Sequence, residues 1–343
     1  MENPRDSVLQ ILSLLTLALV GTAVVWVGST RLEDAAANLA GAYGVPSVVH
    51  GAVIAAVGSS TPELVSVLLA ATRGEFELGV GAIVGSAVFN LLVIPGIAVV
   101  IGDGIETNRD LVYKESLFYM LAVATLLLTF SLAVIYYPVE PANGLISGDV
   151  TRGLALVPIV LYVLYVFTQY LDASESETLA DEGVDLVRSW VVFLVGLVLI
   201  VVGVEALVRA AVGLGDAFGT PAFLWGMTIV AAGSSLPDAF VSIAASQSGR
   251  PTVSIANVLG SNTFDLLVAI PAGVVVAGSL QITFDHVVPM MAFLVVATVV
   301  FFTISRTKMY LSRREGWLLL VLYGGFVTWL VAESVGLTRL LPT

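Results

Sequence analysis

The sequence predicts an all-α integral membrane protein, with ten transmembrane helices arranged as two inverted five-helix repeats. Composition, a count of long apolar segments and a repeat at a fixed offset lead to this prediction. Of the 343 residues, 58% are hydrophobic and only 12% are charged, whereas soluble domains have about 25% charged residues. The chain has no cysteine, and its two histidines, His50 and His286, are far apart. Thiol chemistry is therefore excluded, and zinc enzymology is not expected.

Ten apolar segments follow one another along the chain. We expect spans near 8–28, 46–71, 79–101, 115–137, 153–171, 189–211, 221–246, 254–279, 286–304 and 316–335. Each is long enough, at about 20 residues, to cross the hydrocarbon core as a helix. Lipid admits only helices and closed barrels, and long runs without alternation indicate helices. The first run is too long for a signal-peptide core and no cleavage pattern follows it, so we expect a retained span.

The repeat has an offset of 175 residues and needs no gap. Gly-Ser-Ser-Thr-Pro-Glu at 58–63 returns as Gly-Ser-Ser-Leu-Pro-Asp at 233–238, and Gly-Ser-Ala-Val-Phe-Asn at 85–90 returns as Gly-Ser-Asn-Thr-Phe-Asp at 260–265. Five spans per copy is an odd number, so the second copy enters the membrane from the opposite side, as in many secondary transporters. We expect a first repeat at 1–171, an acidic linker at 172–188 and a second repeat at 189–343.

The charge distribution predicts the orientation. The side that holds both termini has five Lys and Arg residues, and the other side has nine. The positive-inside rule therefore places both termini outside the cell and the acidic linker in the cytoplasm. The expected location is the cell (plasma) membrane, crossed many times.

Span two combines a helix break with oxygen ligands. Pro62 has no N–H, so the carbonyl of Gly58 loses its helical partner. Ser59, Ser60 and Glu63 lie within about one turn of that break. A carboxylate inside an apolar span is costly and marks a functional site. Together these groups offer the hard oxygen ligands that Ca²⁺ prefers.

Span seven repeats this set with Ser234, Ser235 and Asp238, and the second motif adds two further pairs. Ser86 and Asn90 share one helix face, as do Ser261 and Asp265. A structural alternative exists for each feature alone, because prolines kink helices and polar residues join them. That alternative must explain every feature in register in both halves. The candidate ion ligands are therefore Glu63, Asp238, Ser59, Ser234, Ser60, Ser235, Asn90, Asp265, Ser86 and Ser261.

Smaller features lie outside these motifs. The pairs Gly21/Gly28 and Gly196/Gly203 each mark one smooth helix face, which fits either static packing or sliding of spans one and six. The glycines at 79, 81, 85 and 260 are expected to allow close helix approach. Glu205 and Arg209, one turn apart, are expected to pair. We place His50, His286, Glu33, Asp34 and Glu333 at span ends, near the membrane interface.

The doubled motif resembles the cation/calcium antiporter superfamily, and specifically its prokaryotic-type sodium/calcium exchangers with two alpha-repeats. The resemblance covers essentially the whole chain. It implies a secondary transporter, not an enzyme, that exports Ca²⁺ in exchange for Na⁺ by alternating access. It implies no prosthetic group and no partners besides these ions and the lipid bilayer; no nucleic acid is expected, and a monomer is sufficient for transport.

The resemblance also implies roles by position. Glu63 and Asp238 would be the central Ca²⁺ ligands. Ser59 and Ser234, with nearby carbonyls, would complete the Ca²⁺ site and the outer Na⁺ sites. Flanking Na⁺ sites would use Ser86 and Ser261, and the middle would be bordered by Asn90 and Asp265. The chain departs from the pattern at Asp238, which is often Glu in prokaryotic members, and at Ala87, which stands where the other half has Asn.

The coupling ion is less well fixed by the sequence. Asp265 resembles the potassium-dependent branch and also some potassium-independent prokaryotic relatives, so K⁺ use stays open. Three carboxylates around one Ca²⁺ leave excess negative charge, so we expect Asp265 to carry a proton or to bind K⁺ in the Ca²⁺-bound state. A proton/Ca²⁺ antiporter and a cation channel are the alternatives. The repeated acids lie next to Ser and Pro residues and not in the motifs of an intramembrane aspartyl protease, which disfavours that class.

Overall fold

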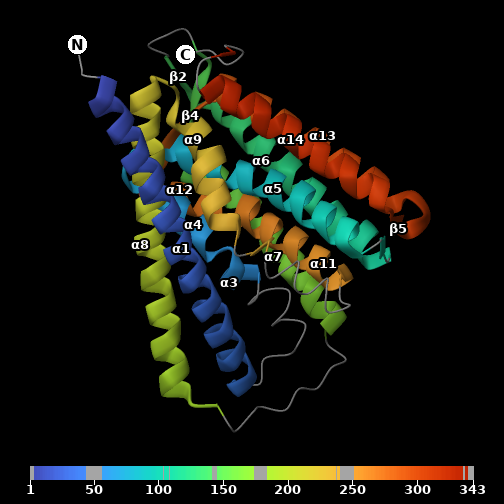
Figure 1. The fold of residues 1–343 in the computed structure, drawn as a ribbon. Coiled ribbons are helices and arrows are strands. Elements are labelled where there is room, and N and C mark those ends of the chain that lie inside the picture. The colour runs from blue at the N-terminus through green and yellow to red at the C-terminus, as the bar shows by residue number, and fades with distance from the viewer. Residues whose placement is uncertain are drawn as a thin grey trace.

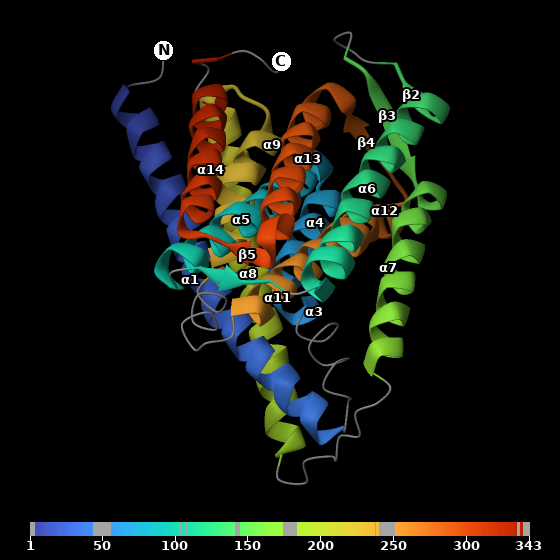
Figure 2. The same ribbon diagram turned by 90° about the vertical axis from the view of Figure 1, so that its right-hand side faces the viewer.

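The spanning helices confirm the predicted fold class. The computed structural model describes residues 4–43, 56–102, 104–107, 109–140, 145–173, 184–236, 238–239, 251–334 and 337–338. Within these ranges, eight helices are long and apolar enough to cross a membrane, and two shorter apolar helices, Thr61–Thr72 and Ala222–Leu236, complete the expected ten. The first turn of α1 and the last turn of α14 lie at the same end of the bundle (Figure 2).

Seven spans are single helices. They are α1 (Pro4–Ala42), α5 (Phe76–Gly102), α6 (Ser116–Tyr136, after a π-helical turn η2 at Asp110–Glu115), α7 (Arg152–Ala173), α8 (Leu186–Phe218), α13 (Phe284–Arg306) and α14 (Arg313–Ser334). Span eight consists of α11 (Pro251–Phe264), a π-helical turn η4 (Asp265–Ala269) and α12 (Ile270–Ala277). Pro271 cannot donate to the carbonyl of Leu267, which accounts for the change of helix type there.

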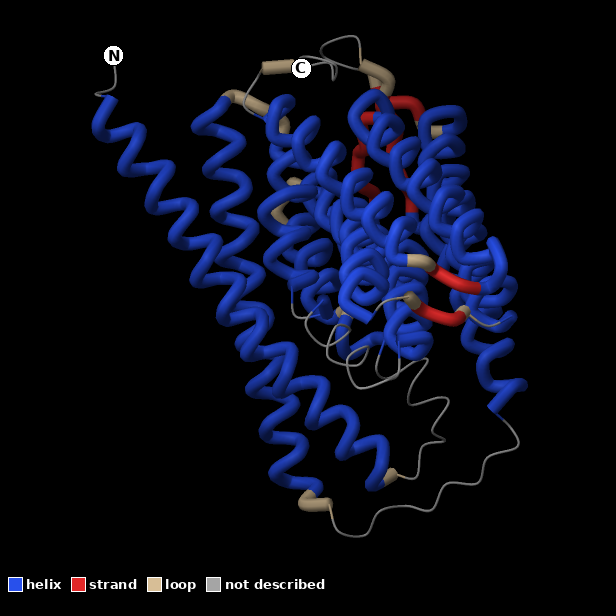
Figure 3. The backbone as a smooth tube through the Cα atoms, turned by 45° about the vertical axis from the view of Figure 1, so that its right-hand side comes forward, coloured by secondary structure: helices blue, strands red, loops and turns tan. Residues whose placement is uncertain are grey.

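Helices α1 and α8 are much longer than their predicted spans. They have 39 and 33 residues, and at about 1.5 Å per residue they measure roughly 58 and 50 Å. A bilayer core is about 30 Å thick, so both helices must tilt or extend beyond it. They lie side by side and project past the rest of the bundle on the side where α8 begins (Figures 1 and 3).

The contact between α1 and α8 shows how the repeats are related. A Cβ atom on Gly21 would lie 2.9 Å from the carbonyl oxygen of Gly203, and one on Gly28 would lie 2.9 Å from that of Gly196. The sequence offset relates Gly21 to Gly196 and Gly28 to Gly203. Gly21 therefore meets the counterpart of Gly28, and Gly28 meets the counterpart of Gly21, as a two-fold axis between inverted repeats requires.

Span two is interrupted, and span seven changes helix type. Span two consists of α3 (Ala56–Ser59) and α4 (Thr61–Thr72), which are separated at Ser60. Pro62 lies in the first turn of α4, where its missing N–H breaks no helical bond. Span seven begins as α9 (Ala222–Trp225), passes through a π-helical turn, η3 (Gly226–Val230), and continues as helix to Leu236, so it changes helix type in this part without a break. The predicted parts 46–55 and 240–246 of these two spans lie outside the described residues.

Helix α5 and the α11–α12 span are the most buried of the long spans. Glycines let α5 approach span seven, since a Cβ on Gly81 would lie 2.5 Å from the Phe223 carbonyl oxygen and one on Gly85 would lie 2.4 Å from that of Met227. The nearest described atom to a Cβ on Gly260 is Tyr165 Oη, at 3.4 Å. The repeat counterpart of Met227, residue 52, lies outside the described residues.

Short strands connect the repeats, which the sequence did not predict. Strands β2 (Pro138–Val139), β3 (Ser147–Thr151) and β4 (Ser279–Thr283) form an antiparallel sheet, and β1 (Ile105–Glu106) pairs with β5 (Tyr310–Leu311); a 3₁₀ turn, η5 (Thr307–Met309), precedes β5. The two sheets lie at opposite ends of the bundle (Figure 2). The strands lie in the loops between spans. Their pairing depends on tertiary contacts and is not encoded in the local sequence pattern.

Candidate cation-binding site

Hydroxyl groups of the four motifs meet in the middle of the chain's core. The Ser59 and Ser261 hydroxyls are 2.7 Å apart, and the Ser60 hydroxyl donates to the Ser261 carbonyl oxygen at 3.4 Å. On the other side, the Ser235 hydroxyl donates to Ser86 Oγ at 2.6 Å. The pairs Ser60–Ser261 and Ser235–Ser86 are counterparts under the repeat offset. These hydroxyls thus join span two to span eight and span seven to span three.

Glu63 lies among these hydroxyls. Its side chain is 1% exposed, and its Oε1 accepts from the hydroxyls of Ser86 and Ser235, at 3.4 Å each. The Ser234 hydroxyl donates to the Ala231 carbonyl oxygen at 3.3 Å. The other oxygen, Oε2, is buried without a partner. A carboxylate held by two halves of the chain, with one oxygen unused, is suited to bind a cation.

Three further motif residues have the same property. Asn90, Asp238 and Asp265 are buried, and each has one side-chain oxygen without a hydrogen-bond partner. An unpaired buried acceptor costs about 1–3 kcal/mol, and more when it is charged. Four such oxygens, at two pairs of repeat-related positions, fit the needs of a hard cation that takes oxygen ligands.

The acids do not form a single cage. Within the described ranges, no three Asp, Glu or His side chains lie close enough together to share one metal ion. Glu63 and Asp265 do act on Asp238 electrostatically. A cation at any one point would therefore be held by one or two carboxylates, with hydroxyl and carbonyl oxygens supplying the other ligands.

Asn262 belongs to the site although the sequence analysis did not select it. It is fully buried, its Oδ1 accepts from Asn90 Nδ2 at 3.1 Å, and its Nδ2 donates to the Ala87 carbonyl oxygen at 3.2 Å. Asn90 Nδ2 also approaches Ser86 Oγ at 3.5 Å. Ala87 is the repeat counterpart of Asn262, so the two positions face each other across the symmetry axis. Because the two positions lie opposite each other, the Asn side chain of one half is matched by the small Ala of the other. This Asn/Ala difference was the sequence signal that could have identified Asn262.

The residues outside the motifs gave mixed results. The predicted pair of Glu205 and Arg209 is confirmed at 2.5 Å, and Arg73 also pairs with Glu205, which connects the end of α4 to α8. His286 lies in the first turn of α13, at a span end as predicted, and is buried within the protein with its Nδ1 3.2 Å from Glu77 Oε2. Glu333 is buried as well. His50 lies outside the described residues.

The inverted repeats and the buried oxygen ligands define a membrane transporter for cations. The family model described as "Sodium/calcium exchanger protein" matches residues 13–171 and 188–332. The chain therefore belongs to the sodium/calcium exchanger family.

Two relatives and one solved structure illustrate this membership. "Inner membrane protein YrbG" of Escherichia coli is 26% identical over 268 residues, which cover 74% of this chain and 77% of the relative. "Uncharacterized membrane protein MJ0091" of Methanocaldococcus jannaschii is 27% identical over 307 residues, or 89% and 94% of the two chains. A structure of the sodium-calcium exchanger NCX_Mj, soaked with Na⁺ and Sr²⁺, matches 93% of this chain and 98% of its own, with a TM-score of 0.63 at 23% identity. It shows that the two proteins share a fold.

Proposed function

We propose that this protein is a secondary active antiporter that exports Ca²⁺ in exchange for Na⁺ by alternating access. The observation that carries the proposal is the set of four buried, unpartnered oxygens on Glu63, Asn90, Asp238 and Asp265. Such oxygens suit hard cations like Ca²⁺ and Na⁺. Membership of the sodium/calcium exchanger family supports the choice of these two ions.

The proposed ion sites follow the two-fold relation. Glu63 and Asp238 bind Ca²⁺ at the centre, with Ser59 and Ser234 beside them. Sites for Na⁺ use the remaining hydroxyls and the second-motif residues, namely Ser60, Ser235, Ser86, Ser261, Asn90 and Asp265. Because both ions draw on the same oxygens, they compete, and competition for one site is what couples their movements.

Alternating access uses α1 and α8 as the moving pair. These helices share an apolar cluster with α4, α5 and span seven, separate from the main core. The glycine faces of α1 and α8 lie against each other, so the two helices can move as one pair, and the Arg73–Glu205 ion pair between α4 and α8 must break or follow this movement. If three Na⁺ exchange for one Ca²⁺, as is usual in this family, each cycle moves one charge. The membrane potential then contributes about 2.3 kcal/mol per 100 mV.

The proposal includes an orientation. Both termini lie outside the cell and the linker at 172–188 lies in the cytoplasm, because more Lys and Arg lie on the linker side. The membrane is the cell membrane, one chain is sufficient for transport, and no resident cofactor is required.

The test is Ca²⁺ uptake into proteoliposomes loaded with Na⁺ and diluted into Na⁺-free buffer. Uptake that requires internal Na⁺ is expected, and liposomes containing Glu63→Gln protein serve as the matched control. Uptake driven equally by a proton gradient without Na⁺ would make the protein a proton/Ca²⁺ antiporter. Flux far above transporter turnover, without a counter-ion, would indicate a channel.

The same liposomes test the role of Asp265. Its separate unpartnered oxygen favours a K⁺ or proton requirement over a third Ca²⁺ ligand. We expect Asp265→Asn protein to transport Ca²⁺ with an altered response to K⁺ or pH. Complete loss of transport at every K⁺ concentration and pH would contradict both versions.

A further inference from the structure

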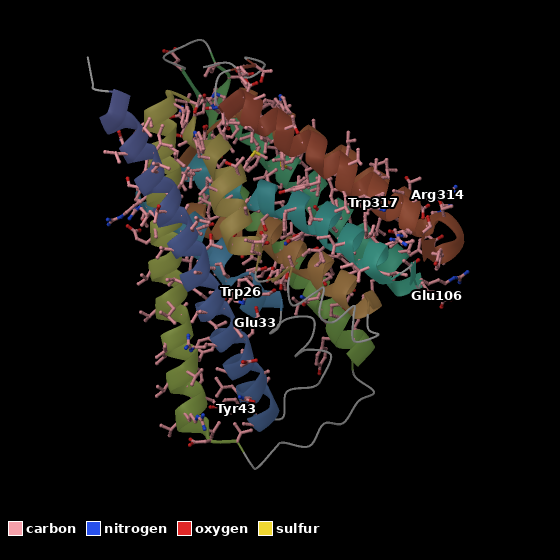
Figure 4. The ribbon with its side chains drawn as sticks, viewed as in Figure 1. Trp26, Glu33, Tyr43, Glu106, Arg314 and Trp317 are labelled. Atoms are coloured by element: carbon pink, nitrogen blue, oxygen red, sulfur yellow. The ribbon has the colours of Figure 1, made fainter. Side chains whose placement is uncertain are left out.

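Glu33 lies against the break in span two. A Cβ atom on Gly58 would be 3.8 Å from Glu33 Cγ and 3.7 Å from Leu32 Cδ2. The Glu33 side chain is half-buried, on the part of α1 next to α3 (Figure 4). It therefore reaches span two, which carries Ser59 and Glu63.

Among the residues that the structure describes, the surroundings of Glu33 are acidic and provide no counter-charge. Glu33 lies within electrostatic range of Glu63 and Asp238. In the part of the chain that the structure describes, its carboxylate has no hydrogen bond or ion pair. Glu63 and Asp238, in turn, each keep one buried oxygen without a partner. A cation that passes close to any of these carboxylates weakens the repulsion between them.

Only one half of the molecule has this acid. The repeat counterpart of Glu33 is Val208, which is fully buried in the apolar cluster of α8. The neighbouring pairs are conserved between halves, since Leu207 lies against Gly233 as Leu32 lies against Gly58. Glu33 is on the second half of α1, toward the end of the bundle where α8 begins and the linker joins it (Figure 4). The acid is therefore specific to the linker-side approach to the site.

We propose that Glu33 is a cation-binding residue carried by α1, which engages Ca²⁺ on its way between the linker-side solution and Glu63. The proposal rests on the proposed exchange function and adds a ligand that acts from one face only. When α1 shifts, Glu33 moves relative to Gly58 and the core. Ion occupancy on the linker side is thereby linked to the position of the moving helix.

The experiment compares Ca²⁺ dependence at the two faces. Na⁺/Ca²⁺ exchange is measured in right-side-out and everted vesicles from the same cells. The face with the linker is identified by labelling a Ser176→Cys protein, which has a single cysteine because the chain has none. Glu33→Gln should raise the half-saturating Ca²⁺ concentration about fivefold or more at the linker face. At the other face the change should stay below about twofold.

Two variants separate ligand binding from other effects. Asp34→Asn removes the same charge from an exposed neighbouring side chain and should leave both faces unchanged. Glu33→Asp should restore part of the affinity. An unchanged linker face, an equal change at both faces, or an equal effect of Asp34→Asn would overturn the proposal. Failure of the exchange function itself would instead appear as absent Na⁺-dependent transport in the unsubstituted protein.

Discussion

The two repeats match closely where α1 crosses α8 and differ where α1 meets span two and α8 meets span seven. At the crossing, the glycine contacts are 2.9 Å in both directions from α1. In span seven, a Cβ on Gly233 would lie 2.8 Å from the Leu207 side chain, whereas one on Gly58, beside the break in span two, would lie 3.7 Å from Leu32. The two halves thus differ in how closely α1 and α8 pack against the core. A carrier that opens to one side at a time requires asymmetry at these two places.

The two central acids differ in a similar way. Glu63 is held by the hydroxyls of Ser86 and Ser235, one from each repeat, whereas Asp238 Oδ1 has no partner. Asp is shorter than Glu by one methylene, so its oxygens cannot take the corresponding position in the other half. The site is therefore formed by equivalent helices of the two repeats, but its two acids differ in length and in hydrogen bonding.

The largest expected effect tests whether both acids are needed despite this difference. Glu63→Gln and Asp238→Asn each keep the side-chain shape and remove a charged ligand, so each should abolish Ca²⁺ uptake into Na⁺-loaded proteoliposomes. Glu205→Gln, at a half-exposed ion pair far from the motifs in sequence, is the control and should retain transport. Near-normal uptake by either site variant, in protein that elutes and unfolds like the unsubstituted chain, would remove that acid from the site.

Much of this comparison could be predicted from the sequence, since the offset alone relates Gly58 to Gly233 and Glu63 to Asp238. Helix lengths could not, because α1 and α8 continue past the apolar stretches into polar residues such as Glu33 that are supported by tertiary contacts. Asn262 and Glu33 were missed for a related reason. Their importance depends on what faces them, which for Asn262 is its own repeat counterpart and for Glu33 is the break at Gly58.

The second prediction concerns the close approach of α5 to span seven. Gly85→Ala would place a Cβ 2.4 Å from the Met227 carbonyl oxygen, and overpacking of this kind costs about 1–3 kcal/mol. We expect a lower melting temperature, measured by the loss of monodisperse protein on heating. Gly324→Ala, on an exposed part of α14 with no described atom within 4 Å, is the control. If the Gly85→Ala and Gly324→Ala proteins have the same melting temperature, α5 has room to move and its contact with span seven is not tight.

The third prediction tests the one polar side chain that breaks the symmetry at the axis. Asn262→Ala makes the two halves alike at this position and removes the partners of Asn90 Nδ2 and the Ala87 carbonyl. Each loss of a buried hydrogen bond costs roughly 1–3 kcal/mol. Thermal stability should therefore fall, while Ca²⁺ still binds. Unchanged stability would mean that water replaces the amide.

The smallest effect is expected from making the central acids identical. Asp238→Glu keeps the charge and lengthens the side chain by one methylene, so transport should continue with an altered half-saturating Ca²⁺ concentration. The direction is informative, because Glu63 shows that a Glu at this position in a repeat can reach hydroxyls of both halves. If Glu at 238 finds the equivalent partners, its oxygens become less available and Ca²⁺ affinity falls. Loss of all transport would instead show that the site depends on the unequal lengths of its two acids.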